Sequence, residues 1–205
     1  MNAAKIHLSP QETELLANTE LLLIKDRIIQ KMIGLYGDMH ELFKKTIIEN
    51  RDSLPSFISE KGGKISKGNN FKGLPFVVLD YPAAFEKKNI FGVRCFFWWG
   101  NYFIISLHLS GKYIPHINDQ KKWLTYFKEK KFSINISGDE WCQIWNDCYE
   151  EIDLDKMQAR NNFLKFAAKI NIDRLDEVPE FLENRFRDIL SFYKTNYHQC
   201  GETVL

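Results

Sequence analysis

One stretch, residues 90–111 (IFGVRCFFWWGNYFIISLHLSG), constrains the fold of this chain more than any other. Two runs rich in aromatic and β-branched residues flank Gly100 and Asn101. This pattern predicts a β-hairpin with a two-residue turn, because glycine accepts the positive φ that such turns require. In that register Trp99 pairs with Tyr102. The hairpin therefore predicts an antiparallel sheet at the centre of the fold.

The register of the hairpin decides which side chains share a face of the sheet. The predicted core face is mostly apolar and includes Arg94, whereas the other face mixes aromatic and polar side chains. The members of this mixed face are Cys95, Phe97, Trp99, Tyr102, Ser106 and His108. Because Arg94 and His108 fall on opposite faces in this register, we do not expect them to form one joint active site.

Further elements are predicted on both sides of the hairpin. Ser9-Pro10-Gln11-Glu12 is typical of a helix start and opens an amphipathic helical part. Strands are expected at 74–81, 131–137 and 163–170, with the start of a helix as the alternative for 163–170, and helices at 119–130 and 178–197. Short links between consecutive strands favour an antiparallel meander. The predicted fold class is α+β, with a sheet of about four or five strands packed by N-terminal and C-terminal helices.

The chain of 205 residues suits one domain. We expect a single α+β domain over 1–198, with a helical part at 9–50 and a sheet-containing part at 74–198. The last residues, 199–205, are expected to form a disordered tail. Residues 138–155 are acidic and place Trp141, Trp145 and Tyr149 at intervals of four, which predicts a short helix with these rings on one face.

Residues 61–70 (KGGKISKGNN) are rich in glycine and lysine and are expected to form a mobile loop. The segment does not match a Walker phosphate-binding loop, because Lys64 is followed by Ile65 and not by Ser or Thr. Two interpretations stay open. The lysines either keep a solvated loop soluble, or Lys64 and Lys67 close over a phosphate or carboxylate.

The net charge is +1, so nothing in the composition favours a nucleic acid partner. No stretch reaches the roughly 18 apolar residues that a membrane span needs, so no membrane partner is expected. The start of the sequence lacks a signal-peptide pattern, and the four cysteines lack a zinc-binding spacing. We therefore expect a cytoplasmic protein with reduced thiols and without a metal or cofactor.

His108 is the candidate for acid/base catalysis, because imidazole titrates near neutral pH. Arg94 either holds an anion or forms a structural ion pair with a carboxylate such as Asp80, since a buried unpaired guanidinium is costly. Trp99 and Tyr102 are candidate ligand-binding residues, together with the two lysines of the basic segment. No nucleophile motif is present, so the sequence leaves open whether the protein is an enzyme.

Three motifs carry a resemblance to a known group of proteins: Leu79-Asp80-Tyr81-Pro82, Phe97-Trp98-Trp99-Gly100-Asn101 and Leu107-His108-Leu109. With them the stretch 73–113 resembles a family of uncharacterised bacterial proteins, and the similarity extends over most of the chain. The resemblance implies a bacterial origin. The resemblance implies no activity, no cofactor and no site residue.

Three functions are compatible with these features. The first is a cytoplasmic module that binds a ligand or partner on the mixed hairpin face. The second is an enzyme that acts on a small anionic substrate, with His108 as acid/base and Arg94 or the lysines binding the anion. The third is an oligomeric structural or interaction protein, a homo-oligomer assembled through the N-terminal helix and exposed aromatic residues.

Overall fold

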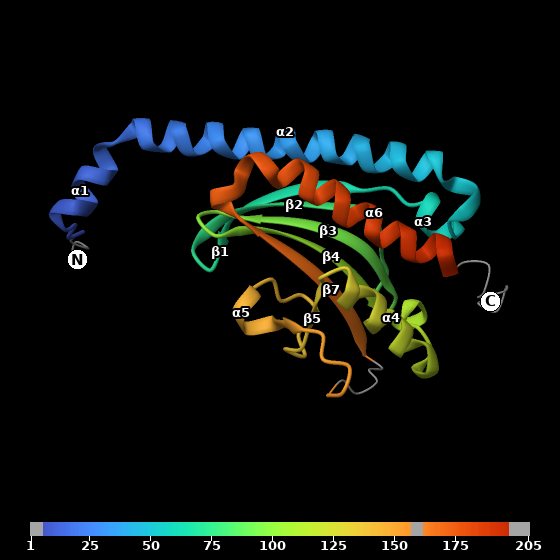
Figure 1. Ribbon diagram of the computed structural model, residues 1–205. Coiled ribbons are helices and arrows are strands. Elements are labelled where there is room, and N and C mark those ends of the chain that lie inside the picture. The colour runs from blue at the N-terminus through green and yellow to red at the C-terminus, as the bar shows by residue number, and fades with distance from the viewer. Residues whose placement is uncertain (1–5, 157–161, 197–205) are drawn as a thin grey trace.

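The computed structural model describes residues 6–156 and 162–196. In this part of the chain a seven-stranded antiparallel sheet is packed by N-terminal and C-terminal helices (Figure 1). The α+β class is therefore confirmed, and the sheet has more strands than the four or five predicted. The predicted tail, 199–205, lies outside the described residues.

The sheet follows the order β1-β2-β3-β4-β7-β5-β6. The strands are β1 (Lys64–Phe71), β2 (Leu74–Phe85), β3 (Ile90–Trp98), β4 (Tyr102–Ser110), β5 (Ser133–Asn135), β6 (Tyr149–Glu151) and β7 (Phe163–Asn171). The helices are α1 (Pro10–Ala17), α2 (Thr19–Glu49), α3 (Ser56–Ser59), α4 (Ile117–Glu129), α5 (Trp145–Cys148) and α6 (Val178–Asn196). Short 3-10 turns span Arg51–Ser53, Gly111–Tyr113 and Ile172–Glu177.

The predicted helical part, 9–50, consists of two helices. The Ser9 hydroxyl accepts a hydrogen bond from the Glu12 backbone N–H, and the Glu12 carboxylate accepts one from the Ser9 N–H. This capping box starts α1 as predicted. The helix stops at Asn18, whose side chain accepts a hydrogen bond from the Leu21 N–H and so begins α2.

Helices α2 and α6 cover one face of the sheet (Figure 1). Phe43 of α2 stacks on Phe186 of α6, with ring centroids 3.8 Å apart. Phe127 of α4 stacks on Phe166 of β7 at 4.2 Å. All four rings are fully buried, and burying each one contributes roughly 1.5–3 kcal/mol. The main hydrophobic core lies in this layer.

The opposite face of the sheet is covered by residues 136–148, which include α5. A smaller apolar cluster lies between this segment and the strands. This cluster consists of Val78, Phe96, Ile104, Cys148, Tyr149 and Ala167. In Figure 1, α5 lies below the sheet, on the side away from α2. Two layers of unequal size therefore enclose the sheet.

The central hairpin is present, but its predicted register is wrong by one residue. Trp98, and not Trp99, lies opposite Tyr102, so three residues form the turn. Gly100 has a φ of 71°, and the Asn101 N–H donates to the Trp98 carbonyl at 3.0 Å. A glycine with positive φ suits a three-residue turn as well as a two-residue one. The local pattern therefore did not fix the turn length.

The register shift exchanges the faces of one strand. Cys95 and Phe97 pack in the core beneath the helices, whereas Ser106 lies on the other face. Arg94 lies opposite Ser106 in the register, and His108 lies two residues further along β4. Arg94 and His108 therefore share a face, which corrects the prediction that they point to opposite sides.

Most of the predicted loop 61–70 is a strand. β1 pairs with β2 at the edge of the sheet, with Lys64 opposite Asp80 and Lys67 opposite Val77. An edge strand tolerates lysine, because charged side chains there prevent pairing with other chains. Gly68 is required where the Phe76 ring lies against the strand, since a Cβ at this position would collide with that ring.

Candidate functional site

The face of the sheet away from the helices carries a cluster of polar side chains. Arg94 of β3 forms a bidentate ion pair with Asp80 of β2, with Nε–Oδ1 at 2.6 Å and Nη2–Oδ2 at 3.0 Å. The guanidinium carbon lies 5.5 Å from the centre of the Phe85 ring and 5.3 Å from that of Trp141. Arg94 is therefore held by a carboxylate and by two aromatic rings, an arrangement that stabilises a cation.

His108 is buried in the same cluster. Its Nε2 lies 3.0 Å from Glu140 Oε2, and its ring meets the Trp141 ring edge-on at 5.1 Å. Burial, followed by the positive charges of Lys165 and Arg94, lowers the pKa of His108 to about 3 in spite of the nearby carboxylate. The imidazole is therefore neutral near pH 7 and donates from Nε2 to Glu140, which suits hydrogen bonding better than proton transfer.

Lys165 of β7 lies directly opposite His108 and is only 1% exposed. Its ammonium group donates to the backbone carbonyls of Glu140 and Cys142, both at 2.9 Å. Burial, followed by the charge of Arg94, lowers the pKa of Lys165 to about 7. The sequence reasoning missed this residue. Its signal was a lysine inside the apolar run FLKFAAKI, where alternation places it on the same face as Ala167.

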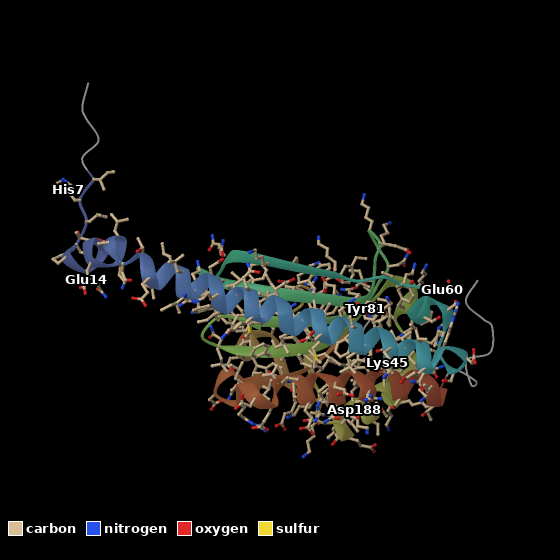
Figure 2. All side chains as sticks on the ribbon, turned by 90° about the horizontal axis from the view of Figure 1, so that it is seen from above. His7, Glu14, Lys45, Glu60, Tyr81 and Asp188 are labelled. Carbon is tan, nitrogen blue, oxygen red and sulfur yellow. A yellow bond between two sulfur atoms is a disulfide. The ribbon has the colours of Figure 1, made fainter. Side chains whose placement is uncertain are left out.

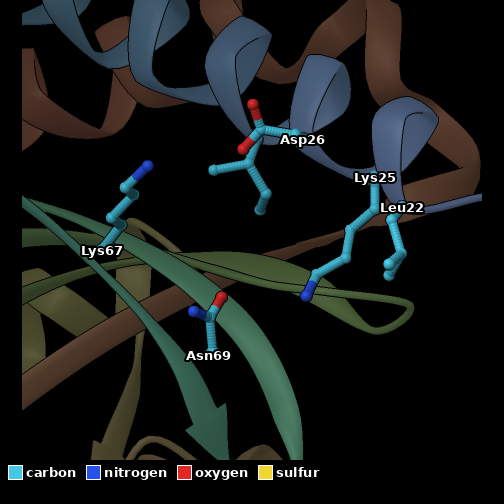
Figure 3. Close-up of a pocket in the computed structure, with 6 residues that line it drawn as sticks. Leu22, Lys25, Asp26, Lys67 and Asn69 are labelled. Carbon is cyan, nitrogen blue, oxygen red and sulfur yellow. The ribbon is translucent and has the colours of Figure 1, made fainter. Parts of the chain in front are cut away.

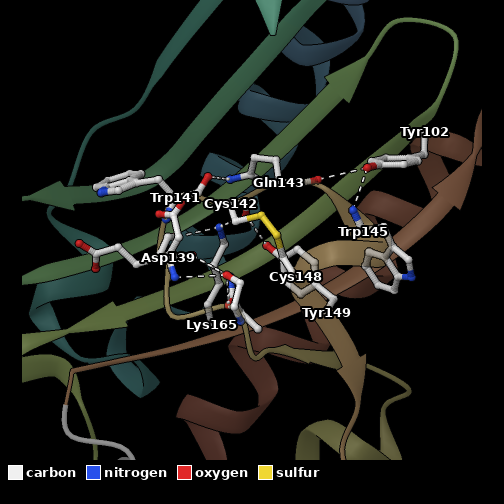
Figure 4. The surroundings of a disulfide bond; sticks show 12 residues. Tyr102, Asp139, Trp141, Cys142, Gln143, Trp145, Cys148, Tyr149 and Lys165 are labelled. Carbon is white, nitrogen blue, oxygen red and sulfur yellow. Dashed lines mark hydrogen bonds between the residues drawn. A yellow bond between two sulfur atoms is a disulfide. The ribbon is translucent and has the colours of Figure 1, made fainter. Parts of the chain in front are cut away.

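Residues 136–148 are fixed over this cluster by several hydrogen bonds (Figure 4). The Tyr102 hydroxyl donates to the Gln143 carbonyl at 3.2 Å and accepts from the Trp145 N–H at 2.9 Å. The Tyr149 hydroxyl donates to the Cys142 carbonyl at 3.1 Å. Tyr102, predicted as a ligand-binding residue, therefore anchors this segment to the sheet.

A disulfide joins Cys142 and Cys148, with the Cα atoms 6.2 Å apart (Figure 4). The expectation of reduced thiols is therefore wrong for these two residues, because the chain brings them within bonding reach across one short loop. Disulfides are rare in the cytoplasm, so this bond does not favour the cytoplasmic location expected from the sequence. That location stays a prediction.

The predicted helix carrying three aromatic rings on one face is wrong. α5 spans only Trp145–Cys148, and Tyr149 already belongs to β6. Trp145 and Tyr149 still stack, with ring centroids 5.2 Å apart. Trp141 lies before the helix and packs on Arg94 instead. Contacts with the aromatic and charged side chains of the sheet face therefore decide where these rings pack, and the helical spacing does not.

The candidate ligand-binding residues do not form a single site. Arg94, Tyr102 and His108 share the covered face. Trp99 lies in the hairpin turn and packs against the core on the helix side. Lys64 and Lys67 are exposed on β1, which is the edge strand beyond β2. Among the described residues, no group of three or more His, Cys, Asp or Glu side chains could hold a metal ion.

A second candidate site is the N-terminal arm, which we define as residues 6–28. The arm extends beyond the sheet (Figures 1 and 2), and the first fully buried residue of α2 is Ile29. α1 buries no residue. The large exposed apolar residues of the arm are Ile6, Leu8, Leu15, Leu16, Leu21, Leu22, Leu23 and Ile24. Such a concentration of exposed apolar side chains marks an interaction surface.

A small cavity of about 220 Å³ lies between α2 and β1 where the arm leaves the body of the protein (Figure 3). It is lined by Leu22, Lys25, Asp26, Ile29, Lys67 and Asn69. In Figure 3 the amino groups of Lys25 and Lys67 extend into the space between helix and strand. Neither amino group forms an ion pair within the described part of the chain, so the cavity carries two unpaired positive charges beside the Asp26 carboxylate.

Comparisons with known proteins give no assignment. No protein-family model, no curated protein and no solved structure matches the chain. The resemblance to uncharacterised bacterial proteins stays a prediction. No helix of the described residues is both long enough and apolar enough to cross a membrane. The geometry of the arm and of the covered cluster is therefore the basis for the function proposed below.

Proposed function

We propose that the protein is an interaction module that binds a second copy of itself through the N-terminal arm. The observation that carries this proposal is the exposure of the arm's leucines: Leu16 is 73% exposed, and Leu22 and Leu23 are each 61% exposed. Burying apolar surface between two copies stabilises an assembly by roughly 25 cal/mol per Å². A monomer leaves this stabilisation unused.

The charges of the arm favour an antiparallel arrangement of the two copies. The first half carries Glu12 and Glu14 and no lysine or arginine, whereas the second half carries Lys25 and Arg27 together with Glu20 and Asp26. In an antiparallel pair the acidic half of each arm lies beside the half of the other that carries Lys25 and Arg27. Such a two-fold interface is self-complementary, as the commonest homodimers require.

A two-fold axis near Thr19 gives the best match of side chains. Leu15 and Leu16 of one copy then meet Leu22 and Leu23 of the other. Glu12 of the second copy then comes level with residues 25–27 at the edge of the cavity between α2 and β1, where Lys25 and Arg27 flank Asp26. The arm bends at Asn18, so each copy pairs through two straight pieces: α1, about 12 Å long, and the first ten residues of α2, about 15 Å long. The leucines of the arm therefore find apolar partners, and Glu12 finds basic neighbours.

An anionic membrane is a less suitable partner for the arm. Amphipathic helices that bind such surfaces carry lysine and arginine on their polar face. The polar residues of α1 include Glu12 and Glu14 and no basic residue. The second copy of the chain is therefore the occupant to which we commit.

The test is the solution mass of an arm variant. The chain mass is 24.2 kDa, and we expect light scattering to give twice this value for the wild type. The double variant Leu16→Glu/Leu23→Glu should have the monomer mass. Ile48→Glu is the matched control, because Ile48 is 62% exposed on the same helix but outside the arm, and it should remain a dimer. A monomeric wild type, or a dimeric double variant, would contradict the proposal.

Charge reversal tests the antiparallel arrangement separately. Lys25→Glu/Lys67→Glu should weaken the homodimer, and so should Glu12→Lys/Glu14→Lys. Mixing the two variants should restore a dimer that contains one copy of each, because opposite charges face each other again. If neither variant affects the dimer, the arms pair in another way. If the wild type binds lipid vesicles instead, self-association is not the function of the arm.

A further inference from the structure

Residues 136–148, the covering segment, place the Glu140 carboxylate against a group of basic side chains. Arg94, His108 and Lys165 come from the adjacent strands β3, β4 and β7 and lie on one face. Glu140 approaches from residues 136–148 and contacts His108 at 3.0 Å. The His108 side chain is 5% exposed, but that of Glu140 is 31% exposed. Glu140 therefore lies at the solvent edge of a buried basic cluster.

The cluster retains unused capacity for hydrogen bonding. The Ser106 hydroxyl is fully buried and has no hydrogen-bond partner among the described residues, although it lies opposite Arg94 and two residues from His108. The Lys165 ammonium group has three protons and donates two hydrogen bonds, both to backbone carbonyls. Buried polar groups normally find partners, so the Ser106 hydroxyl is a donor that an acceptor on this face would satisfy.

We propose that this cluster is a binding site for a small carboxylic acid, and that Glu140 closes the site as an internal ligand. The Glu140 side chain ends in a carboxylate on two methylene groups, so its own shape is that of propionate. Trp141 packs on His108 and Arg94 beside it, so the ligand would occupy the place of the Glu140 carboxylate. This inference goes beyond the proposed self-association and does not depend on it.

The existing contacts assign a part to each residue. His108 would donate from Nε2 to the ligand carboxylate, as it does to Glu140. Lys165 in its protonated form would supply the positive charge, because Asp80 already neutralises Arg94. Glu140 would turn toward the solvent, which its partial exposure permits without removing Trp141 from the sheet. The carboxylate changes places with a chemically equivalent group, so the interactions of the cluster are retained.

The test is binding of propionate to Glu140→Ala. Calorimetry should show that this variant binds sodium propionate roughly tenfold or more tightly than the wild type, a factor typical of coupling between competing groups. Propionate should also raise the melting temperature of the variant more than an equal concentration of sodium chloride does. Glu150→Ala is the matched control, because Glu150 is exposed on β6. It should respond to propionate as the wild type does.

A second pair of variants keeps the proposal testable. If Glu140→Ala does not fold, Glu140→Gln retains the side-chain length and should still bind propionate more tightly than the wild type. Adding Lys165→Met to either variant should abolish this binding. The proposal is overturned if propionate and chloride act alike on the folded Glu140 variant, or if Lys165→Met leaves binding intact. Equal affinity of wild type and variant, or a response to phosphate without one to propionate, would also overturn it.

Discussion

The Arg94 guanidinium and the Asp80 carboxylate form a two-point ion pair between neighbouring strands, on the face of the sheet away from the helices. The side chains are only 20% and 10% exposed, respectively. The positive charge is thereby balanced before Trp141 and Phe85 close over it. The pair permits a charged residue to lie on the interior strand β3 of a largely apolar sheet.

Removing one partner of this ion pair should destabilise the folded protein. Asp80→Ala leaves the Arg94 charge buried and unpaired, so we expect the free energy of unfolding to fall by about 3 kcal/mol or more. The free energy of unfolding should fall less in the double variant Asp80→Leu/Arg94→Met, because this variant removes both charges. Urea unfolding of the two variants measures the difference. Equal stability of the single variant and the wild type would show that the pair is solvated in solution.

Lys165 should make stability depend on pH above neutrality. Its pKa is lowered to about 7 in the folded protein, whereas an unfolded lysine titrates near 10.4. Between these values the unfolded chain binds one proton more than the folded one, so stability rises with pH. We expect the free energy of unfolding of the wild type to rise, relative to that of Lys165→Met, by up to about 1.4 kcal/mol per pH unit in this window.

Urea unfolding of both proteins from pH 7 to pH 10 measures this difference. Comparing the two proteins cancels the titration of the buried tyrosines, which both retain. Lys194→Met is a suitable control, because Lys194 lies far from the cluster on α6 and bonds to Asn50. A constant difference between wild type and Lys165→Met across the window would mean that Lys165 stays charged in the folded state.

His108 should have the corresponding effect in acid. Its pKa is lowered to about 3 in the folded protein, and an unfolded histidine titrates near 6.5. The unfolded chain therefore takes up a proton first as the pH falls through this range, and the folded state loses stability. His108→Gln should lose less stability than the wild type between pH 6.5 and pH 4. Parallel loss in both proteins would disprove the effect.

The disulfide should hold the covering segment in place. Cys142 and Cys148 are six residues apart, and closing so short a loop stabilises a protein by about 2 kcal/mol in the chain-entropy account. Cys142→Ser/Cys148→Ser should therefore be less stable by about this amount. Hydrogen exchange should increase in residues 139–148 and remain unchanged in α6. Unchanged exchange in that segment would show that the hydrogen bonds of Tyr102 and Tyr149 suffice.

The stack of Phe43 on Phe186 should be the main connection between α2 and α6. Phe186→Ala removes a fully buried ring and should cost about 3–5 kcal/mol. Ile172→Ala is a control at a position 37% exposed, and it should change stability by much less. Thermal unfolding of both variants measures the effect. Similar losses in the two variants would mean that the helix layer repacks around the missing ring.

Much of the fold could be predicted from local patterns. The capping box at Ser9, the strand at 163–170 and the C-terminal helix all follow from short-range signals, and the structure confirms them. The length of the turn at Gly100 could not be decided locally. The glycine fits either turn, and the register that settles it is set by pairing with β2 and β7.

The covered cluster was beyond local reasoning for a different reason. His108 and Glu140 are 32 residues apart, and Lys165 is 25 residues from Glu140. Their contacts depend on residues 136–148 folding back over the sheet. The sequence did name Asp80 as an example of the carboxylate that Arg94 could pair with, because a charge in an apolar strand needs a partner, and the structure shows this pair. It could not indicate which distant segment would reach Lys165.

Helix α2 belongs partly to the core and partly to the arm, without interruption from Thr19 to Glu49. In a dimer of paired arms it would act as a strut that keeps the two sheets apart. The spacing would then depend on the number of helical residues between Thr19 and Ile29. Seven additional residues would lengthen each strut by about 10 Å and turn it by nearly two full turns, so the contact faces would keep their orientation. The length of α2 would thus set the distance between the two copies.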